Sequence, residues 1–540
     1  MQMKTVFERK LAQPWVQWLA VFIFISLGFV LVENMGYTNE VDVLPLARQF
    51  ADPHWMPNDW YLNQPAGYRF LFSSLVGPLI KVWGFLATSI IGRLFCYGLV
   101  AAGLVGIGRA LRLSLPYLLL AIALFFYSWE DQGMTAEEWI VGGLEAKSIA
   151  YGFVLLAIAA ILRRHERQAA AFLGIATSFH VLVGGWAMVS GLPLWFWHNR
   201  KSFSISRFLT VGTFFSIFSA FASPAVVKQL LTPVPESSIS PSFIYVFLRL
   251  PHHLNPFAWN TVGWVRLGLF TAAFGLTVFL IVRQRNRLPE AQFQACWDLI
   301  LFTGLSMVPF LIGLLVAPLD AQGKLLQYYP FRLGDVLLPL ATFLLIAVSL
   351  EQQLRYWNYR AWAILGIVLL VVFTVSQTEK FVYSIEDIQG YPDTQQESDE
   401  EWRDLCGWIR RNTSKEAVFV TLPLNRNSFS WMTERAIVAN YKFLPQTTQE
   451  IVEWYERVDD LTEGKLSSLA TDTEKLHWTR GVSVDIRKEL RSAYLNLDTT
   501  AATALMNKYQ ASYFLSRSGH VLNLPIAYQT HSYILYQNPQ

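Results

Sequence analysis

The chain has 540 residues, of which 53% are hydrophobic and only 15% are charged, and its formal net charge is +3. Soluble domains carry about 25% charged residues, so this composition excludes a soluble globule and a disordered chain. The small and scattered net charge also excludes a typical nucleic-acid-binding protein. A polytopic membrane protein is the class that remains.

Eleven apolar segments approach the roughly 20 residues that a membrane-spanning helix needs. They are residues 14–32, 87–108, 114–128, 148–162, 168–183, 184–198, 205–222, 261–282, 297–317, 333–350 and 361–376. Residues 68–81 are apolar but shorter, and we expect a surface-lying or re-entrant helix there, before the second span.

The loops between these segments differ in charge. Alternate loops hold 16 basic residues against four acidic ones, whereas the opposite loops are long and acidic. The positive-inside rule therefore predicts a cytoplasmic N-terminus. With an odd number of spans, the region after the last span lies on the exterior face, in a periplasm or lumen.

The charge density changes after residue 376. Residues 1–376 hold 26 basic and 18 acidic side chains, whereas residues 377–540 hold 17 basic and 22 acidic ones. The sequence predicts a transmembrane domain over 1–376 and a small exterior α/β domain over 377–540, with a polar linker at 386–401. The predicted helices of that domain are 399–411, 448–457 and 501–509, and its predicted strands are 417–422, 436–441, 511–515 and 533–536.

Two carboxylates, Glu40 and Asp42, follow the first span closely. Near the membrane surface, desolvation would raise the pKa of at least one of them, and such a group can take a proton from a hydroxyl nucleophile. The pair can also hold a divalent metal, or both can be solvated surface acids. Asp52 and Asp59 follow in tryptophan-bearing turns, where we expect Asp52 to be a turn cap and Asp59 to contact substrate.

Charged residues also stand at the mouths of later spans. Glu145 and Lys147 lie at the mouth of one span, where we expect an ion pair with each other or with a neighbour, or a role in a substrate path. His180 lies in an apolar segment, as a core residue or a functional one. His252 and His253 form a loop pair without an acidic partner in the sequence, so no metal site is predicted there.

Arg332 and Asp335 begin the span that follows the third long exterior loop, beside Tyr328 and Tyr329. A guanidinium at this level suits a phosphate or pyrophosphate group. The alternative is an Arg–Asp pair that caps the helix.

Several stretches resemble the GT-C superfamily of membrane glycosyltransferases, and most closely a bacterial branch of domains of unknown function. These stretches are LPLARQFADPHWMPNDWYLN, GLEAKSIAYG, GIATSFHVLVGGW, QYYPFRLGDVLLPLA, AVFVTLP and WMTERAIVANYK. The resemblance implies an all-α polytopic bundle of about 11 spans with an exterior α/β domain, in a bacterial inner membrane. Asn39 stands where an acidic residue is expected if the motif begins one position earlier.

The resemblance implies catalysis by Asp42 and Glu40, with Mg or Mn held by them if a metal is used. It implies a polyprenyl-phosphate sugar donor bound at Arg332, and we assign substrate contacts to Glu145, Lys147, His180, Asp59 and Tyr329. The expected partners are this donor and membrane lipids, and no nucleic acid. The expected function is sugar transfer to an acceptor on the exterior face. The alternatives are a transporter or flippase of lipid-linked precursors and a non-catalytic assembly protein. Few charges inside the spans and no inverted repeat argue against transport.

Overall fold

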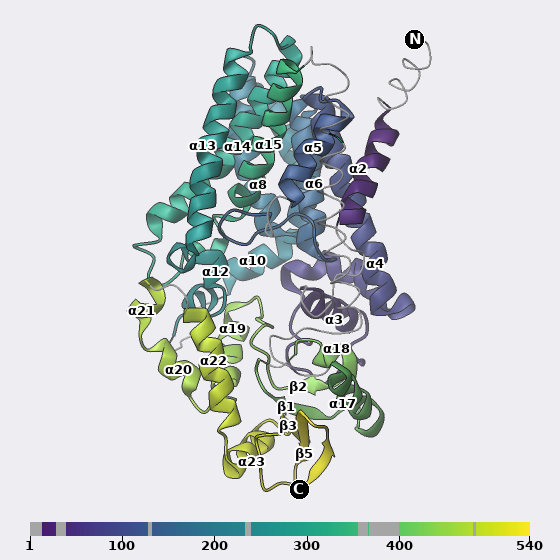
Figure 1. Ribbon diagram of the computed structural model, residues 1–540, viewed down its shortest axis with the longest axis vertical. Helices are drawn as coiled ribbons and strands as arrows, with labels where there is room; N and C mark the ends of the chain where they lie inside the picture. The colour runs from purple at the N-terminus through teal and green to yellow at the C-terminus, as the bar shows by residue number, and fades with distance from the viewer. Residues whose placement is uncertain are drawn as a thin grey trace.

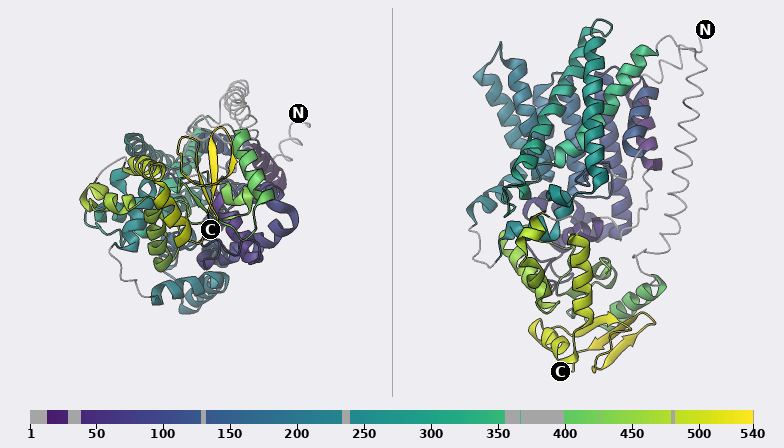
Figure 2. Two further views of the ribbon diagram at one scale, coloured as in Figure 1. Left: turned by 90° about the horizontal axis from the view of Figure 1, so that it is seen from below. Right: turned by 60° about the vertical axis from the view of Figure 1, so that its left-hand side comes forward.

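The computed structural model describes residues 13–28, 39–127, 132–232, 239–354, 366, 399–424, 426–478 and 482–539. Long helices run side by side along the long axis of the molecule, and a smaller mixed part lies at one end of them (Figure 1). A second direction of view shows the same division (Figure 2). This division agrees with the predicted fold class, a helical bundle followed by a small α/β tail.

The bundle helices differ widely in length. Their bounds are α2 Pro14–Gly28, α4 Phe70–Ala110, α5 Leu115–Tyr127, α6 Ala146–Leu162, α7 Glu166–Phe179, α8 Val181–Asn199, α9 Ile205–Phe218, α10 Ser223–Leu231, α13 Thr261–Arg283, α14 Glu290–Val316 and α15 Arg332–Gln353. Each of the ten predicted segments before residue 351 overlaps one of these helices. The eleventh, 361–376, falls almost entirely outside the described residues, as does most of the predicted linker.

Four helices of the described residues are long and apolar enough to cross a membrane: Gly67–Ala110, Thr261–Arg283, Glu290–Val316 and Arg332–Gln353. A fifth span results if α9 and the helix after it, bent by 55°, are counted together. Three shorter helices, α2, α5 and α6, are also apolar. The chain is a multi-pass membrane protein, and the number of eleven spans stays a prediction.

The first part of α4 is the helix predicted before the second span. Gly84 has a φ of 75° and a ψ of 175°, which interrupts the helix and separates residues 70–83 from the rest. Glycine adopts this conformation without a steric penalty. The segment packs closely on helix α3 (Glu40–Ala51), because a Cβ added at Gly77 would lie 2.1 Å from the carbonyl oxygen of Ala47.

Short helices occupy the loops, and we had not predicted them except for the two at 67–69 and 220–222, which overlap the predicted segments 68–81 and 205–222. They are α3 Glu40–Ala51, η1 Gly67–Arg69, η2 Ala220–Ala222, α11 Pro241–Phe243, the π-helix η3 Ile244–Arg249, α12 Pro251–Leu254, η4 Pro256–Ala258 and η5 Leu326–Tyr328. Helix α3 lies between the bundle and the tail (Figure 1).

The tail contains a five-stranded sheet of order β2-β1-β3-β5-β4. Its strands are β1 Val418–Thr421, β2 Ala436–Ile437, β3 Tyr513–Arg517, β4 Ile526–Gln529 and β5 Tyr533–Gln537. Strands β2, β1 and β3 are parallel, and β5 is antiparallel to both β3 and β4. All seven predicted elements are present, although the strand predicted at 436–441 is much shorter.

The helices of the tail are α17 Asp399–Asn412, α18 Phe429–Thr433, α19 Thr448–Asp460, α20 Lys465–Ala470, α21 Thr473–Trp478, α22 Val482–Leu495 and α23 Thr499–Lys508. Apolar side chains from tail and bundle share one buried cluster, in which Phe247 and Phe331 of the bundle join Tyr441 and Trp454 of the tail. The Tyr441 hydroxyl also donates to the carbonyl oxygen of Leu248 at 2.5 Å. The tail is therefore packed on the bundle loops rather than held by the linker alone.

Candidate functional site

A cavity of about 1010 Å³ lies where the bundle loops meet the tail, and residues of both parts line it. Six of the eight predicted site residues are in its wall: Asp42, Glu145, Lys147, His180, Tyr329 and Arg332. Glu40 and Asp59 are not. The positions of the six fit one shared site, and their chemical roles stay predictions.

Glu40 and Asp42 both lie in the first turn of α3. Successive helical residues are turned by about 100°, so residues two apart point to opposite sides. Glu40 is fully buried on the bundle side, where Arg93 Nε and Nη2 donate to its two oxygens at 2.8 and 2.7 Å. The Ser89 hydroxyl donates to it as well. The structure therefore separates the two carboxylates that we expected to act as a pair.

Asp42 points into the cavity, with a side chain that is 12% exposed. Arg69 Nη2 lies 3.3 Å from its Oδ2, and the Tyr61 hydroxyl donates a short hydrogen bond to its Oδ1. Arg69 is the last residue of η1, directly before α4. Carboxylate oxygens have several lone pairs, so Asp42 retains the capacity to accept a substrate hydroxyl.

Arg332 is the first residue of α15 and is 8% exposed. Its Nη1 lies 2.9 Å from His180 Nε2, and its Nε lies 3.1 Å from Glu138 Oε2. The guanidinium stacks on the Tyr329 ring, 3.8 Å from the centroid. Tyr329 has a φ of 53°, a left-handed conformation that is costly for a bulky residue and recurs at functional sites.

His180 lies at the break between α7 and α8, not within one continuous helix. A guanidinium has only donors, so Nε2 of His180 accepts from Arg332, while the backbone N–H of Val183 faces His180 Nδ1 at 3.4 Å. Gly184 permits the sharp turn, because a Cβ there would lie 2.2 Å from the backbone nitrogen of Thr177. His180 thereby fixes one side of the Arg332 guanidinium.

Glu138 connects two cations of the cavity. Its Oε1 lies 3.2 Å from Lys147 Nζ, while its Oε2 faces Arg332. Lys147 also lies over the Trp139 ring, 3.9 Å from the centroid. Burial raises the pKa of the nearby Glu145 carboxyl, against the opposing effect of Lys147. The partner of Lys147 is therefore its neighbour Glu138 rather than Glu145, which is one of the two ion pairs expected for this position.

Asp335 does not pair with Arg332, the alternative considered for this helix end. Its carboxylate instead accepts hydrogen bonds from the backbone N–H groups of Met134, Thr135, Ala136 and Glu138, and from the Thr135 hydroxyl. Asp335 thus holds the loop that carries Glu138 against the start of α15. Gly133 is required for this approach, because an added Cβ would lie 2.1 Å from Asp335 Oδ2.

Asp59 lies outside the cavity and is 2% exposed. It accepts hydrogen bonds from the backbone N–H groups of Leu62 at 2.8 Å and of Ile437 at 3.2 Å. Burial raises the pKa of Asp59 to about 6, although these hydrogen bonds oppose the shift. The residue therefore connects the first loop with strand β2 of the tail, a structural position that does not fit substrate contact.

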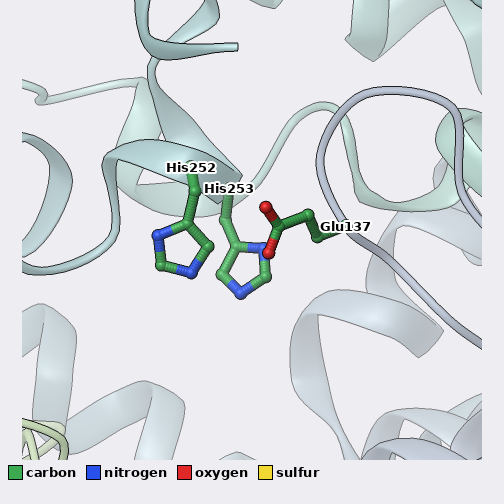
Figure 3. Close-up of side chains that lie close together, drawn as sticks. All are labelled: Glu137, His252 and His253. Carbon is green, nitrogen blue, oxygen red and sulfur yellow. The ribbon is translucent and has the colours of Figure 1, made fainter. Parts of the chain in front are cut away.

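One cluster of the described residues has the geometry of a metal site. The ligand atoms of Glu137, His252 and His253 all lie within 4.8 Å of one another, in the wall of the cavity. Figure 3 shows the two imidazoles side by side and the Glu137 carboxylate directed toward them. His253 Nδ1 lies 2.6 Å from the Ala136 carbonyl oxygen, so Nδ1 carries the proton and Nε2 has its lone pair available. The acidic partner that the sequence did not reveal comes from a loop more than a hundred residues away.

Sequence reasoning missed Arg69, Tyr61, Arg93 and Glu138. Arg69 had a usable signal, because it stands alone at the start of an apolar segment on the predicted exterior face. Arg93 had another, as an arginine inside a predicted span. Nothing local distinguishes Glu138 from the other acids of its loop.

A family described as a domain of unknown function, DUF6798, matches residues 400–461. The crystal structure of ArnT from Cupriavidus metallidurans bound to undecaprenyl phosphate is similar over 97% of this chain and 96% of that chain, with 13% sequence identity and a TM-score of 0.44. No curated protein matches the sequence. Similarity at this level carries no inference about activity, so the function must rest on the side chains of this chain.

Proposed function

We propose that the chain is a membrane glycosyltransferase, which moves a sugar from a polyprenyl-phosphate donor to an acceptor on the exterior face. The observation that carries the proposal is the composition of the cavity. A partly exposed carboxylate, Asp42, shares one wall with three cations, Arg69, Lys147 and Arg332, at the ends of apolar helices. A lipid phosphate needs such cations at the membrane surface, and a hydroxyl acceptor needs such a base.

The donor phosphate is proposed to bind Arg332 and Lys147, which Glu138 and His180 hold in place. As the phosphate enters, it also attracts Arg69 and weakens the Arg69–Asp42 ion pair. Asp42 is then able to accept the proton of the acceptor hydroxyl. The acceptor oxygen bonds to the anomeric carbon while the bond from that carbon to the phosphate oxygen breaks. The phosphate leaves with the electron pair, stabilised by the cations, and the anomeric configuration inverts.

Glu40 is proposed to act through position rather than through chemistry. Its bidentate pairing with Arg93 anchors the first turn of α3, and Asp42 projects from the same turn. Glu40 is a positioning residue on this view, because no face of its carboxylate opens to the cavity.

If a divalent metal takes part, we propose that Glu137, His252 and His253 hold it, and not Glu40 and Asp42. The oxygens of Glu40 and Asp42 are already engaged by Arg93 and Arg69. Two imidazoles and one carboxylate are typical ligands of first-row transition metals, with open positions left for water or substrate. Burial lowers the pKa of both imidazoles, that of His253 to about 3, which keeps them in the neutral form. A bound ion would add positive charge to the cavity wall.

The proposed orientation follows the loop charges, with the N-terminus in the cytoplasm and the tail in the periplasm of a bacterial inner membrane. A transporter would need a path between the two faces of the membrane, whereas a glycosyltransferase needs only the cavity on the exterior face. A non-catalytic assembly protein would have no need for a partly exposed carboxylate beside three cations.

The test is Asp42→Asn, which keeps the shape of the side chain and removes its charge and basicity. Transfer from a radiolabelled polyprenyl-phosphate sugar should fall by about 10²–10⁴-fold, the usual contribution of a positioned general base. Binding of polyprenyl phosphate should not weaken, because its phosphate contacts Arg332 and Lys147. Asp52→Asn is the matched control, because Asp52 lies at the other end of α3 and pairs with Arg48 outside the cavity. Transfer by Asp42→Asn at the wild-type rate would reject the assignment.

A further inference from the structure

A second cavity, a groove of about 1290 Å³, lies at the end of the bundle that is farther from the tail. It is lined by the starts of α2 and α5, the end of α4, the residue that follows α6 and the end of α15. Helix α15 connects the two cavities, because Arg332 at its start lines the first one and Glu351 near its end lines the groove. Along an α-helix these residues are about 28 Å apart, close to the roughly 30 Å of a bilayer's hydrocarbon core. The groove therefore lies at the opposite end of a candidate span, where Figure 1 shows the start of α2.

The charged residues in the wall of this groove are three arginines and one carboxylate. Arg109 lies in the last turn of α4, Arg112 in the turn before α5, and Arg163 directly after α6. The carboxylate of Glu351 accepts a hydrogen bond from the backbone N–H of Ser114 at 3.2 Å. We call this cavity the arginine groove. Its excess of positive charge lies near a helix end, the level at which lipid headgroups are found.

Two of these arginines are held in place by neutral groups of neighbouring helices. Arg163 Nη2 donates to the carbonyl oxygen of Gly106 at 2.7 Å. The helices α4 and α6 approach closely here, because a Cβ added at Gly106 would lie 2.7 Å from the Cβ of Ala159. Arg109 Nη1 lies 3.4 Å from Oε1 of Gln17, a buried polar residue within the apolar helix α2. A guanidinium has five N–H donors, so the Gly106 contact leaves Arg163 able to bind an anion as well.

The arginines are close enough to repel one another. Burial lowers the pKa of the Arg163 guanidinium, and the charge of Arg109 adds to the shift. Arg112 has a φ of 54°, a left-handed conformation that is uncommon for a residue other than glycine, and it lies in the short turn between α4 and α5. An anion bound among the three side chains would offset their repulsion.

The rest of the arginine groove is suited to a hydrocarbon chain. Most of its remaining wall is apolar: Pro14, Trp15, Trp18, Ala102, Val105, Leu113, Leu115 and Pro116. Trp15 is 66% exposed and Trp18 is 36% exposed, and tryptophan is enriched at the interface between membrane and water. The Trp18 indole N–H donates to the carbonyl oxygen of Gly98 at 2.8 Å, which fixes this ring against α4. A wall that combines arginines with an apolar surface matches an amphiphile better than a free ion.

We propose that the arginine groove binds an anionic phospholipid of the leaflet opposite the tail, which is the cytoplasmic leaflet in the proposed orientation. The guanidinium groups of Arg112 and Arg163 donate to the lipid phosphate, and the acyl chains lie along the apolar wall beside Trp15 and Trp18. A zwitterionic lipid fits less well, because its headgroup cation is repelled by the same arginines. This site is separate from the cavity of the proposed transferase reaction and does not depend on that reaction.

The test measures lipid binding to the full-length protein in detergent by native mass spectrometry. Phosphatidylglycerol and phosphatidylcholine with the same acyl chains are titrated separately. Arg112→Gln with Arg163→Gln should weaken phosphatidylglycerol binding by about tenfold or more, since each basic residue beside an anionic headgroup contributes about a factor of five. Phosphatidylcholine binding should not change. The matched control is Arg167→Gln with Arg287→Gln, which removes two exposed arginines from loops at the same end of the bundle but outside the groove.

A second variant separates a loss of charge from damage to the fold. Arg112→Lys with Arg163→Lys keeps both charges and should retain most of the phosphatidylglycerol binding, whereas a loss as large as that of the glutamine variant would overturn the proposal. Glycerol 3-phosphate, which has the phosphate without the acyl chains, should not displace the lipid even in large excess. Displacement would assign the groove to a soluble phosphate instead. Equal phosphatidylglycerol affinities of the glutamine variant and its matched control, or equal affinities of the wild type for the two lipids, would also overturn the proposal.

Discussion

Three neighbours contact the Arg332 guanidinium: Glu138, His180 and the Tyr329 ring. We expect Arg332→Ala to weaken polyprenyl-phosphate binding by about tenfold or more, because a charge-assisted hydrogen bond to phosphate contributes about 1.5–3 kcal/mol. Arg332→Lys should restore only part of the affinity, because it keeps the charge and loses the planar fork. The measurement is equilibrium binding of radiolabelled polyprenyl phosphate in detergent.

The control is Arg283→Ala, an exposed arginine at the end of α13 that does not line the cavity. Equal binding by Arg332→Ala and Arg283→Ala would remove Arg332 from the phosphate site.

Single residues were predictable where the sequence places a charge at the mouth of an apolar segment. Asp42, Lys147 and Arg332 were found in this way, and all three line the cavity. Their partners were not predictable, because Glu138 reaches Arg332 across almost two hundred residues of sequence. The opposite directions of Glu40 and Asp42 were not predictable either, because the helix at 40–51 was not predicted and residues two apart in a helix point to opposite sides.

At the scale of elements, the site depends on a loop that Asp335 holds through five hydrogen bonds. We expect Gly133→Ala to push this loop away from α15, because its Cβ would lie 2.1 Å from Asp335 Oδ2 and 2.8 Å from the Glu138 carbonyl oxygen. The cost should be about 1–3 kcal/mol of stability, as for other overpacked sites. Donor binding should weaken as well, because Glu138 then loses its position beside Arg332 and Lys147. Thermal unfolding and polyprenyl-phosphate binding measure the two effects.

Gly268→Ala on α13 is the matched control, because a Cβ there meets no atom within 4 Å. In a helix interior this change is expected to be neutral or slightly stabilising. An unfolding temperature and donor affinity of Gly133→Ala equal to those of Gly268→Ala would show that the loop has room to adapt.

Helices and strands were predictable where hydrophobic pattern and length agree, as for α13, α17, β1 and β5. The short helices next to the tail were not, because their apolar residues contact the tail and follow no long period of their own. The span count is also undecided by pattern alone: α2, α5 and α6 are apolar and shorter than a full span, so length and composition do not determine how they lie in a membrane.

At the scale of the whole molecule, the change in charge density predicts a boundary between bundle and tail near residue 377, which lies outside the described residues. The sequence did not show how the two parts meet. Buried contacts such as Tyr441 with Leu248 and Asp59 with Ile437 join residues far apart in the chain. The cavity exists only because of this docking, since both parts supply its wall. A change that loosens the contact between bundle and tail should therefore also disturb the cavity.

Asp59 makes this docking sensitive to pH. Its pKa is raised from 3.8 to about 6 by burial, so the folded protein binds the proton more tightly than the unfolded chain does. The stabilisation from this group is fully present below pH 3.8 and is lost as the pH rises to about 6, a change of about 3 kcal/mol. The difference in unfolding temperature between wild type and Asp59→Asn should therefore shift in favour of the variant as the pH rises from 4 to 7, and stay constant above it. Asp52→Asn is the contrasting control, since Arg48 lowers the pKa of Asp52 and the sign of its contribution is reversed. Parallel pH profiles of wild type and Asp59→Asn would show that the Asp59 carboxyl does not govern how the tail docks.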